Sequence, residues 1–373
     1  MAPVESLTLS RRQMVEIAKA LARKPKILIL DEATSALTAA DVLRVFALLK
    51  RLRDEGMAIV YISHRMSEIE ELADDCSVFR NGSHVATFEA GARSRNELVE
   101  MMIGRDIEHA FPPKRVAPQT GYDKDAPALE TRNLSWNGRL HNISMSVRPG
   151  EIVGLGGLDG QGQRELFLAL FGVLRGVEGE ILLDGKPVVV RDPKHAKSDA
   201  LAIALVPEDR KSDGLMLPMS VRDNLCYASL SRLSRLGIVS KTKAGLAVAA
   251  AVKRLSIKAP DPTVSVGTLS GGNQQKVVIG KWLMNQPRVL LLSDPTRGID
   301  VGTKQEIYLL VRNLAASGAA VMLYSTDYAE LIGCCDRVAV FYDGRIVRWL
   351  EGSELTEHAL VSSALNLAEE TTT

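Results

Sequence analysis

The sequence predicts a mixed α/β protein with a mostly parallel central sheet, built from one module that occurs twice and is incomplete in its first copy. Short apolar runs typical of buried strands alternate with segments of helical spacing. Comparing the chain with itself at a constant offset of 262 residues gives an ungapped match. Asn81-Gly82, between two strand-like runs, is the signal of a type I′ hairpin and predicts an antiparallel finish to the sheet.

The first copy is predicted to alternate helices and strands. Pro25 ends the first helix because proline has no N–H to donate. The predicted elements are a helix over Gln13–Arg23, a strand over Lys26–Leu30, a helix from Thr38 through Leu52, a strand over Met57–Ile62, a helix over Met66–Ala73, and strands over Cys76–Arg80 and Ser83–Phe88.

The second copy opens near Ala128, after a segment rich in proline and charge that is typical of a linker. Subtracting 262 from 128 places the matching start of the first copy 134 positions before residue zero. We therefore expect a chain that lacks about the first 130 residues of a longer protein, through truncation or a misplaced start codon. A genuine half-module is the less favoured alternative, because half a sheet leaves strands unpaired. The predicted divisions are 1–88 for the partial module, 89–127 for the linker, 128–352 for the complete module and 353–373 for a tail.

Length and composition exclude several classes of protein. A chain of 373 residues exceeds the usual size of one hydrophobic core, so two domains are expected. The 46 Lys+Arg and 45 Asp+Glu give a net charge of +1, without the basic surplus typical of nucleic-acid-binding proteins. No apolar run reaches the roughly 18 residues of a membrane span, and the N-terminus carries no export signal, which predicts a cytosolic location. Cys76, Cys226, Cys334 and Cys335 have no metal-ligand spacing and are predicted to be reduced packing residues.

A glycine-rich loop marks a candidate phosphate site in the second copy. A strand over Glu151–Leu155, a loop over Gly156–Gly162 and a helix over Gln163–Phe171 form the order in which backbone N–H groups and a helix N-terminus bind phosphate. The full pattern is G-x-x-x-x-G-K-[ST], and Gln163 and Arg164 replace its last two residues. Alone, this segment fits an ordinary strand-turn-helix equally well. The candidate phosphate contacts are Gly157, Gly160, Gly162, Gln163 and Arg164.

Further motifs in both copies decide how this loop is interpreted. Leu269-Ser270-Gly271-Gly272-Asn273-Gln274-Gln275 is followed about twenty residues later by Leu291-Leu292-Ser293-Asp294-Pro295-Thr296-Arg297-Gly298-Ile299-Asp300, and the first copy contains Ile27-Leu28-Ile29-Leu30-Asp31-Glu32 and Ile62-Ser63-His64. This order resembles that of the ATP-binding cassette (ABC) family. The pair of cassettes and the wording of the motifs resemble the ATP-binding subunits of bacterial importers for ribose, galactose, xylose and similar sugars. The expected fold is a tandem of nucleotide-binding domains of the P-loop NTPase type.

The resemblance implies ATP and Mg²⁺ as cofactors. Asp31 would hold the metal, Glu32 would orient or deprotonate the attacking water, and His64 would sense the γ-phosphate. A helix cap alone would explain Ser270 but not the two glycines that follow it. The residues expected to bind nucleotide from the second copy are Ser270, Gly271, Gly272, Asn273, Gln274 and Asp300.

The resemblance also implies that each ATP lies between the loop of one cassette and the signature of the other. The offset of 262 then gathers the departures from the family pattern on one composite site: Gln163, Ser293, Asp294, Thr326, Leu9 and Ser10. The other site keeps Asp31, Glu32, His64 and the whole signature. The sequence therefore predicts one catalytic site and one degenerate site.

The implied partners are two transmembrane permease subunits, docked beside Ser220–Leu230 and Glu208–Gly214, and a periplasmic sugar-binding protein further upstream. The chain would be peripheral, on the cytoplasmic face of the bacterial inner membrane, with no nucleic acid bound. Two alternatives stay open. A twin-cassette protein of the ribosome would carry a longer, helical linker, and a silent scaffold would not need Asp31, Glu32 and His64.

Overall fold

The chain consists of two compact units, and the computed structural model describes most of each. The units are Met1–Ala110 with Arg297–Thr303, and Phe111–Thr296 with Lys304–Thr373. The structure describes residues 3–4, 7, 9–31, 33–34, 37, 39–63, 66–80, 83–94, 97–98, 101, 111–114 and 126–366. Asn81-Gly82 and most of the predicted linker lie outside these ranges. None of the described helices is both long enough and apolar enough to span a membrane.

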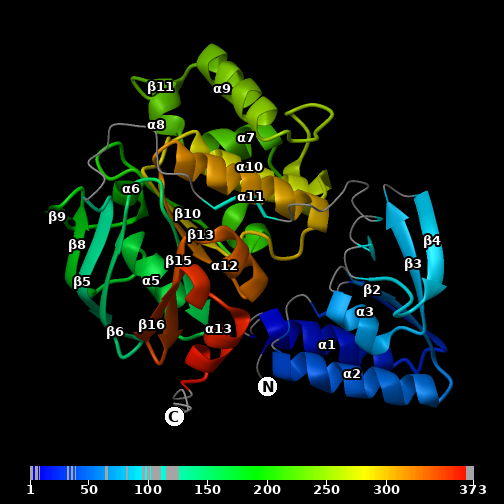
Figure 1. Ribbon diagram of the computed structural model, residues 1–373. Coiled ribbons are helices and arrows are strands. Elements are labelled where there is room, and N and C mark those ends of the chain that lie inside the picture. Colours follow the sequence, from blue (N-terminus) through cyan, green and yellow to red (C-terminus); the bar gives the residue numbers. More distant parts are fainter. Residues whose placement is uncertain are drawn as a thin grey trace, which may run out of the picture. The chain divides into compact units, whose positions relative to one another are not determined.

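The described part of the first unit contains two parallel strands, two antiparallel strands and the helices α1, α2 and α3 (Figure 1). Its elements are α1 (Leu9–Leu21), β1 (Ile27–Asp31), α2 (Ala39–Asp54), β2 (Ala58–Ile62), α3 (Met66–Leu72), β3 (Asp75–Arg80) and β4 (Ser83–Glu89). Ile17 of α1 packs with Leu28 and Leu30 of β1 and with Val45 and Leu49 of α2. The helices therefore cover one face of the parallel pair.

The opposite face of these strands is exposed. Ile27 and Ile29 are 61% and 66% exposed, and Val60 and Ile62 of β2 are 49% and 48% exposed. Within the described part of the unit, β1 and β2 pair only with each other. Such an apolar row in water is unfavourable, because buried apolar area stabilises a fold by about 25 cal/mol per Å².

The second unit is built on a six-stranded sheet of order β10-β13-β14-β7-β15-β16. All neighbours are parallel except β15 and β16, which form an antiparallel pair at the edge. This confirms the predicted parallel sheet with an antiparallel finish. The strands are β7 (Ile152–Gly157), β10 (Ile203–Val206), β13 (Val289–Ser293), β14 (Ala320–Tyr324), β15 (Arg337–Tyr342) and β16 (Arg345–Glu351).

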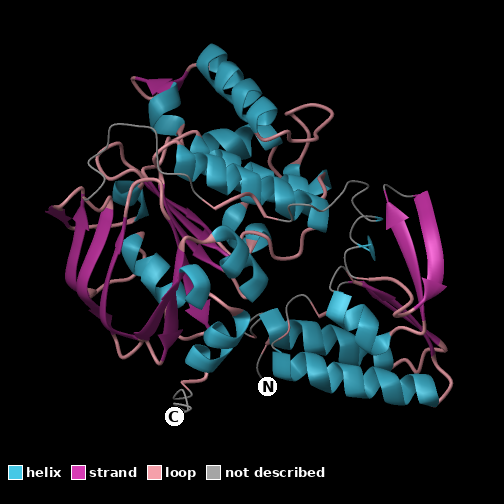
Figure 2. Ribbon diagram, in the orientation of Figure 1, coloured by secondary structure: helices cyan, strands magenta, loops and turns pink. Residues whose placement is uncertain are grey.

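Helices flank this sheet (Figure 2). The longer ones are α5 (Gln163–Leu170), α7 (Val221–Tyr227), α9 (Lys241–Arg254), α10 (Gly271–Leu283), α11 (Val301–Ala316), α12 (Tyr328–Cys334) and α13 (Glu357–Ala364). Short helices are α6 (Pro193–Ala196), α8 (Leu230–Leu233), the π-helix η2 (Arg210–Gly214), and the 3₁₀ turns η3 (Val266–Thr268) and η4 (Gly352–Glu354). The segment predicted as a tail contains α13, whose Leu360 is fully buried.

The sequence did not predict a second sheet in this unit. It is antiparallel, of order β6-β5-β8-β9, with a two-stranded hairpin elsewhere in the unit. Its strands and those of the hairpin are β5 (Leu129–Trp136), β6 (Leu140–Val147), β8 (Glu178–Leu183), β9 (Lys186–Val188), β11 (Ser234–Arg235) and β12 (Ile238–Val239). The register of β5 shifts against both of its neighbours, so its side chains do not keep the strict alternation by which a strand is predicted.

The repeat is confirmed element by element. Adding 262 to the bounds of α1 gives those of α10, and the same sum converts β1 into β13 and β2 into β14. It also converts α2, α3, β3 and β4 into α11, α12, β15 and β16. Over these seven elements the two copies share one local structure, while their side chains differ.

The four cysteines are all buried, as packing residues are. Burial raises the pKa of each thiol, to about 12 for Cys334. These thiols are therefore uncharged at neutral pH.

Candidate functional site

In each copy two neighbouring parallel strands end side by side, at the points in the sequence that the predicted catalytic residues follow. In the first unit Asp31, the last residue of β1, is paired with Ile62, the last residue of β2. The side chain of Asp31 is exposed and accessible to a ligand. Glu32 and His64 lie outside the described residues.

The second unit has the same arrangement with different side chains. Ser293, at the end of β13, is paired with Tyr324, at the end of β14. Beyond these ends Thr326 Oγ1 donates to Asp294 Oδ2 over 2.8 Å. The counterparts of positions 32 and 64 therefore meet, as the repeat predicts, and in this copy a hydroxyl binds the carboxylate.

The glycine-rich loop connects a strand to a helix, as predicted, but begins later in the sequence than predicted. Strand β7 continues through Gly156 and Gly157, which pair with Val340 and Phe341. Glycine permits this pairing, since a Cβ on Gly157 would lie 2.4 Å from the carbonyl oxygen of Phe341 and its φ is +121°. Gly162, at φ 110°, is the N-cap of α5.

The side chain that replaces the loop lysine turns back into the loop. Gln163 is 1% exposed, and its Nε2 donates to the carbonyl oxygens of Gly156, at 3.0 Å, and Leu158, at 3.2 Å. Its side-chain NH₂ group is therefore bound within the loop, and the predicted phosphate contact of Gln163 stays a prediction. Arg164 is exposed.

The carboxylate of Asp159, inside this loop, was not identified from the sequence as a feature of the site. Tyr324 Oη donates to Asp159 Oδ1 over 3.2 Å, across 165 positions of chain. Burial, and then the charge of Asp159, raise the pKa of Tyr324, so the phenol remains a neutral donor. A negative charge in a phosphate loop disfavours phosphate. An acidic residue between the glycines was the signal that could have revealed it.

The signature begins helix α10. Ser270 is its N-cap, and Ser270 Oγ accepts from the side-chain amide of Asn273 at 2.9 Å. Ser270 is exposed and Gly271 partly so, whereas Gly272 is buried. The helix start is thus open to an anion at its first residues.

Two residues predicted to contact nucleotide, Asn273 and Gln274, also form hydrogen bonds with nearby backbone groups. The Gln274 side chain is 5% exposed, and its Nε2 donates to the carbonyl oxygen of Leu269 at 3.1 Å. Asn273 Oδ1 accepts from the backbone N–H of Lys258 at 2.8 Å. Gln274 thus holds the end of the segment before α10, and Asn273 links the start of α10 to Lys258.

Asp300 begins α11. Its two carboxylate oxygens accept from the backbone N–H of Thr303, at 2.9 Å, and from Thr303 Oγ1, at 2.8 Å. This is the geometry of an N-cap, which fixes the carboxylate at the start of the helix. The predicted nucleotide contact therefore has a structural task as well.

Helix α10 is hydrogen-bonded to the segment predicted to contact the permease. Lys281 of α10 is 9% exposed, and its Nζ donates to the carbonyl oxygen of Gly214, the last residue of η2, at 2.6 Å. Burial, and then the charge of Lys197, lower the pKa of Lys281 to about 8. Asp209 caps η2 by accepting from the N–H groups of Lys211 and Ser212.

The buried lysine predicts a pH-dependent stability. Its folded pKa of about 8 lies below the ordinary 10.5, so between these values the unfolded chain binds more protons and stability rises with pH. We expect the free energy of unfolding in urea to rise by about 1 kcal/mol more between pH 8 and pH 9 in the wild type than in Lys281→Met. The buried thiols titrate in both proteins and cancel in the difference. Identical pH profiles of the two proteins would contradict the inference that a charged Lys281 destabilises the fold below pH 8.

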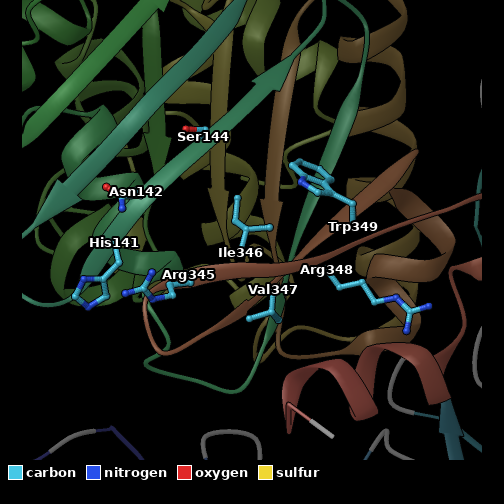
Figure 3. A pocket seen from close by; sticks show the side chains of 8 residues that line it. All are labelled: His141, Asn142, Ser144, Arg345, Ile346, Val347, Arg348 and Trp349. Atoms are coloured by element: carbon cyan, nitrogen blue, oxygen red, sulfur yellow. The ribbon is translucent and has the colours of Figure 1, made fainter. Parts of the chain in front are cut away.

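A groove between β6 and β16 is lined by side chains of both strands (Figure 3). Basic groups line it, among them His141, Arg345 and Arg348. None of its eight lining residues is buried, so the groove offers no polar group held in place by packing. We assign no site to it.

Known proteins resemble the chain in both sequence and fold. A family model described as ABC transporter matches residues 140–297. The ribose import ATP-binding protein RbsA 1 of Mesorhizobium japonicum is 64% identical over 368 residues, which is 98% of this chain and 71% of that protein. The ribose import ATP-binding protein RbsA of Geobacillus kaustophilus is 41% identical over 96% of this chain and 71% of its own length.

Solved structures agree on the fold. A nucleotide-free ATP-binding cassette from an ABC transporter, 21% identical, superposes with a TM-score of 0.55 over 63% of this chain and 95% of its own. CbiO1 of Clostridium perfringens, part of an ABC transporter complex, is 25% identical, with a TM-score of 0.54 over 66% of this chain and 96% of its own. With a cassette fold in the second unit and 64% identity across nearly all of the sequence, the chain belongs to the family of ABC transporter ATP-binding proteins.

Proposed function

We propose that the chain is the ATP-hydrolysing subunit that energises import of ribose or a similar simple sugar through a membrane permease. The observation that carries this proposal is the signature Ser270-Gly271-Gly272 at the exposed start of the 13-residue helix α10. Relatives with 64% and 41% identity are named for ribose import, which supports the substrate class. A ribosomal twin-cassette protein or a silent scaffold gains no support from these relatives.

The proposed catalytic site uses Asp31, Glu32 and His64 with the signature. Asp31 holds Mg²⁺, Glu32 orients the attacking water, and His64 contacts the γ-phosphate. Within the described part of the chain no cluster of three or more His, Cys, Asp or Glu side chains could cage a metal. An exposed single carboxylate fits Mg²⁺, which in nucleotide sites takes one or two carboxylates together with phosphate oxygens and water.

The second composite site is proposed to bind nucleotide weakly and leave it unhydrolysed. Gln163 is engaged by loop carbonyls, Asp159 adds a negative charge to the loop, and Ser293 replaces the metal carboxylate. A γ-phosphate and Mg²⁺ therefore lack the cation and carboxylate that would hold them. Nucleotide there would contribute to association of the cassettes rather than to turnover.

The permease is proposed to dock on the segment around α7. Met216, Met219, Tyr227 and Leu230 are 37%, 39%, 50% and 38% exposed, which is an apolar surface suited to a protein partner. Asn224 fixes this segment, since its side chain binds the N–H and carbonyl of Met216 and the carbonyl of Ser220. A periplasmic sugar-binding protein would act on the other side of the membrane, and the chain would lie at the cytoplasmic face.

An ATPase assay tests the assignment of the sites. The purified 373-residue chain is expected to show no steady ATP hydrolysis, because its glycine-rich loop has Gln163 and Arg164 in place of Lys and Ser/Thr. Steady hydrolysis that disappears in Glu32→Gln would contradict this expectation. Affinity capture from membranes should recover permease subunits, and recovery of ribosomes instead would favour the rival function.

A further inference from the structure

Each copy holds a buried carboxylate on the helix that follows the second parallel strand. In the first unit this is Glu68 of α3, which is 3% exposed. Glu68 Oε1 accepts from Thr34 Oγ1 at 2.7 Å, and Oε2 accepts from Ser63 Oγ at 2.6 Å. Tyr61 Oη donates to Oε2 at 2.8 Å and lies 3.0 Å from Thr34 Oγ1. One carboxylate thus binds both chain segments that follow β1 and β2.

The second copy repeats the arrangement with residues at the same offset. Glu330 of α12 is 1% exposed and accepts from Thr296 Oγ1 at 2.6 Å and from Ser325 Oγ at 2.7 Å. Thr296 and Ser325 lie 262 positions after Thr34 and Ser63, as Glu330 does after Glu68. A buried cluster that occurs twice in one chain is a built feature and not a chance contact.

The two copies differ in the other side chains that contact the buried carboxylate. Tyr308 Oη donates to Glu330 Oε1 at 2.7 Å, and Lys304 Nζ forms an ion pair with the same oxygen at 2.9 Å. Burial opposes the charged form of Glu330, but Lys304 and the hydrogen bonds outweigh it and lower the pKa of Glu330. The position of Lys304 is occupied by Val42 in the first copy, so this lysine has no counterpart at the same offset.

The positions of the two hydroxyl residues in the sequence indicate what the cluster does. Thr34 lies two residues after Glu32, and Ser63 lies immediately before His64. We infer that Glu68 is a positioning residue for ATP hydrolysis: by holding Thr34 and Ser63 together, it sets the distance between the segments that carry the water-orienting and phosphate-sensing groups. This inference rests on the proposed function and adds a residue to its catalytic site.

A carboxylate suits this task because both of its oxygens only accept hydrogen bonds. Glutamine has nearly the same shape, but its NH₂ group offers a donor where Glu68 offers an acceptor. In Glu68→Gln a hydroxyl that faces the NH₂ group can no longer donate to it and must turn to accept, so the arrangement of donors changes while the packing volume is kept. Displacements of this kind near reacting groups reduce turnover more than ground-state binding.

The test uses the full-length gene product assembled with its permease. We expect Glu68→Gln to lower kcat about tenfold and to change the dissociation constant of ATP less than about twofold. Glu32→Gln with Glu68→Gln is expected to be no slower than Glu32→Gln alone in single-turnover assays, because Glu68 acts through Glu32 and its neighbours. Multiplying losses, or an unchanged kcat in Glu68→Gln, would overturn the positioning role.

Glu330→Gln is the matched control in the second copy. It leaves the partly buried Lys304 without a charged carboxylate at Glu330, and so should lower thermal stability more than Glu68→Gln does. Its kcat per folded molecule is nevertheless expected to stay within about twofold of wild type. If kcat instead followed stability across both variants, Glu68 would be a structural residue only.

Ser63→Ala is the second variant, for the case that Glu68→Gln does not fold. It leaves Glu68 with the hydroxyls of Thr34 and Tyr61 and is expected to lower kcat several-fold with unchanged ATP affinity. An unchanged kcat would overturn the inference. If Glu32→Gln itself left turnover intact, the proposed function would fail and the inference with it, a result distinct from failure of Glu68 alone.

Discussion

Glu32→Gln is expected to remove most ATP turnover of the full-length gene product with its permease, by about a hundredfold or more, while Asp294→Asn changes it little. A carboxylate activates water only beside a γ-phosphate and Mg²⁺ that are correctly held. Near Asp294 the means of holding them are absent: Gln163 binds loop carbonyls, and Ser293 stands in place of the metal carboxylate. Thr326 also binds the Asp294 carboxylate.

The measurement is ATPase and transport in the same reconstituted vesicles. Asp294→Asn and Glu32→Gln each neutralise one carboxylate at matching positions of the repeat, so each serves as the control for the other. Equal losses in both variants would mean that the sites are equivalent, and the assignment of one catalytic and one degenerate site would have to be given up.

Gly271→Glu should be as damaging as Glu32→Gln, although Gly271 belongs to the second copy. Gly271 is the first residue of α10 and is partly exposed beside its N-cap, Ser270. Glutamate there would place a bulky anion where the helix N-terminus and backbone N–H groups meet phosphate in the proposed catalytic site. We expect a loss of about a hundredfold in ATPase rate with little loss of stability.

Gly245→Glu is the matched control. Gly245 is an exposed residue of α9, and a Cβ added there meets nothing within 4 Å. The same charge and the same side chain are thus added at an exposed position of a different helix. Gly245→Glu is expected to keep its ATPase rate. If both variants lost activity equally, the effect of Gly271→Glu would be one of charge or folding and not of the signature.

Much of the fold followed from the sequence because strands and helices leave local patterns. The strand at Lys26–Leu30 and the helix through Leu52 were predicted within a few residues of β1 and α2. The antiparallel sheet of β5, β6, β8 and β9 was missed, because shifts of register break the alternation of its side chains. The packing of α13 was missed as well, since Leu360 is buried against strands far away in the sequence.

The features of the candidate site likewise divide into those that the sequence determined and those that only the tertiary structure decided. The signature, the Asp31-Glu32 pair and the uneven losses between the copies are matters of residue identity and spacing, so the chain alone determined them. The inward turn of Gln163, the bond of Tyr324 to Asp159 and the hydroxyl cluster of Glu68 were decided only by the tertiary structure. Each depends on which polar groups share a buried space, and a buried polar group binds whichever partner the fold brings to it. Tyr324 and Asp159 are 165 positions apart, so no local pattern in the sequence indicates their contact.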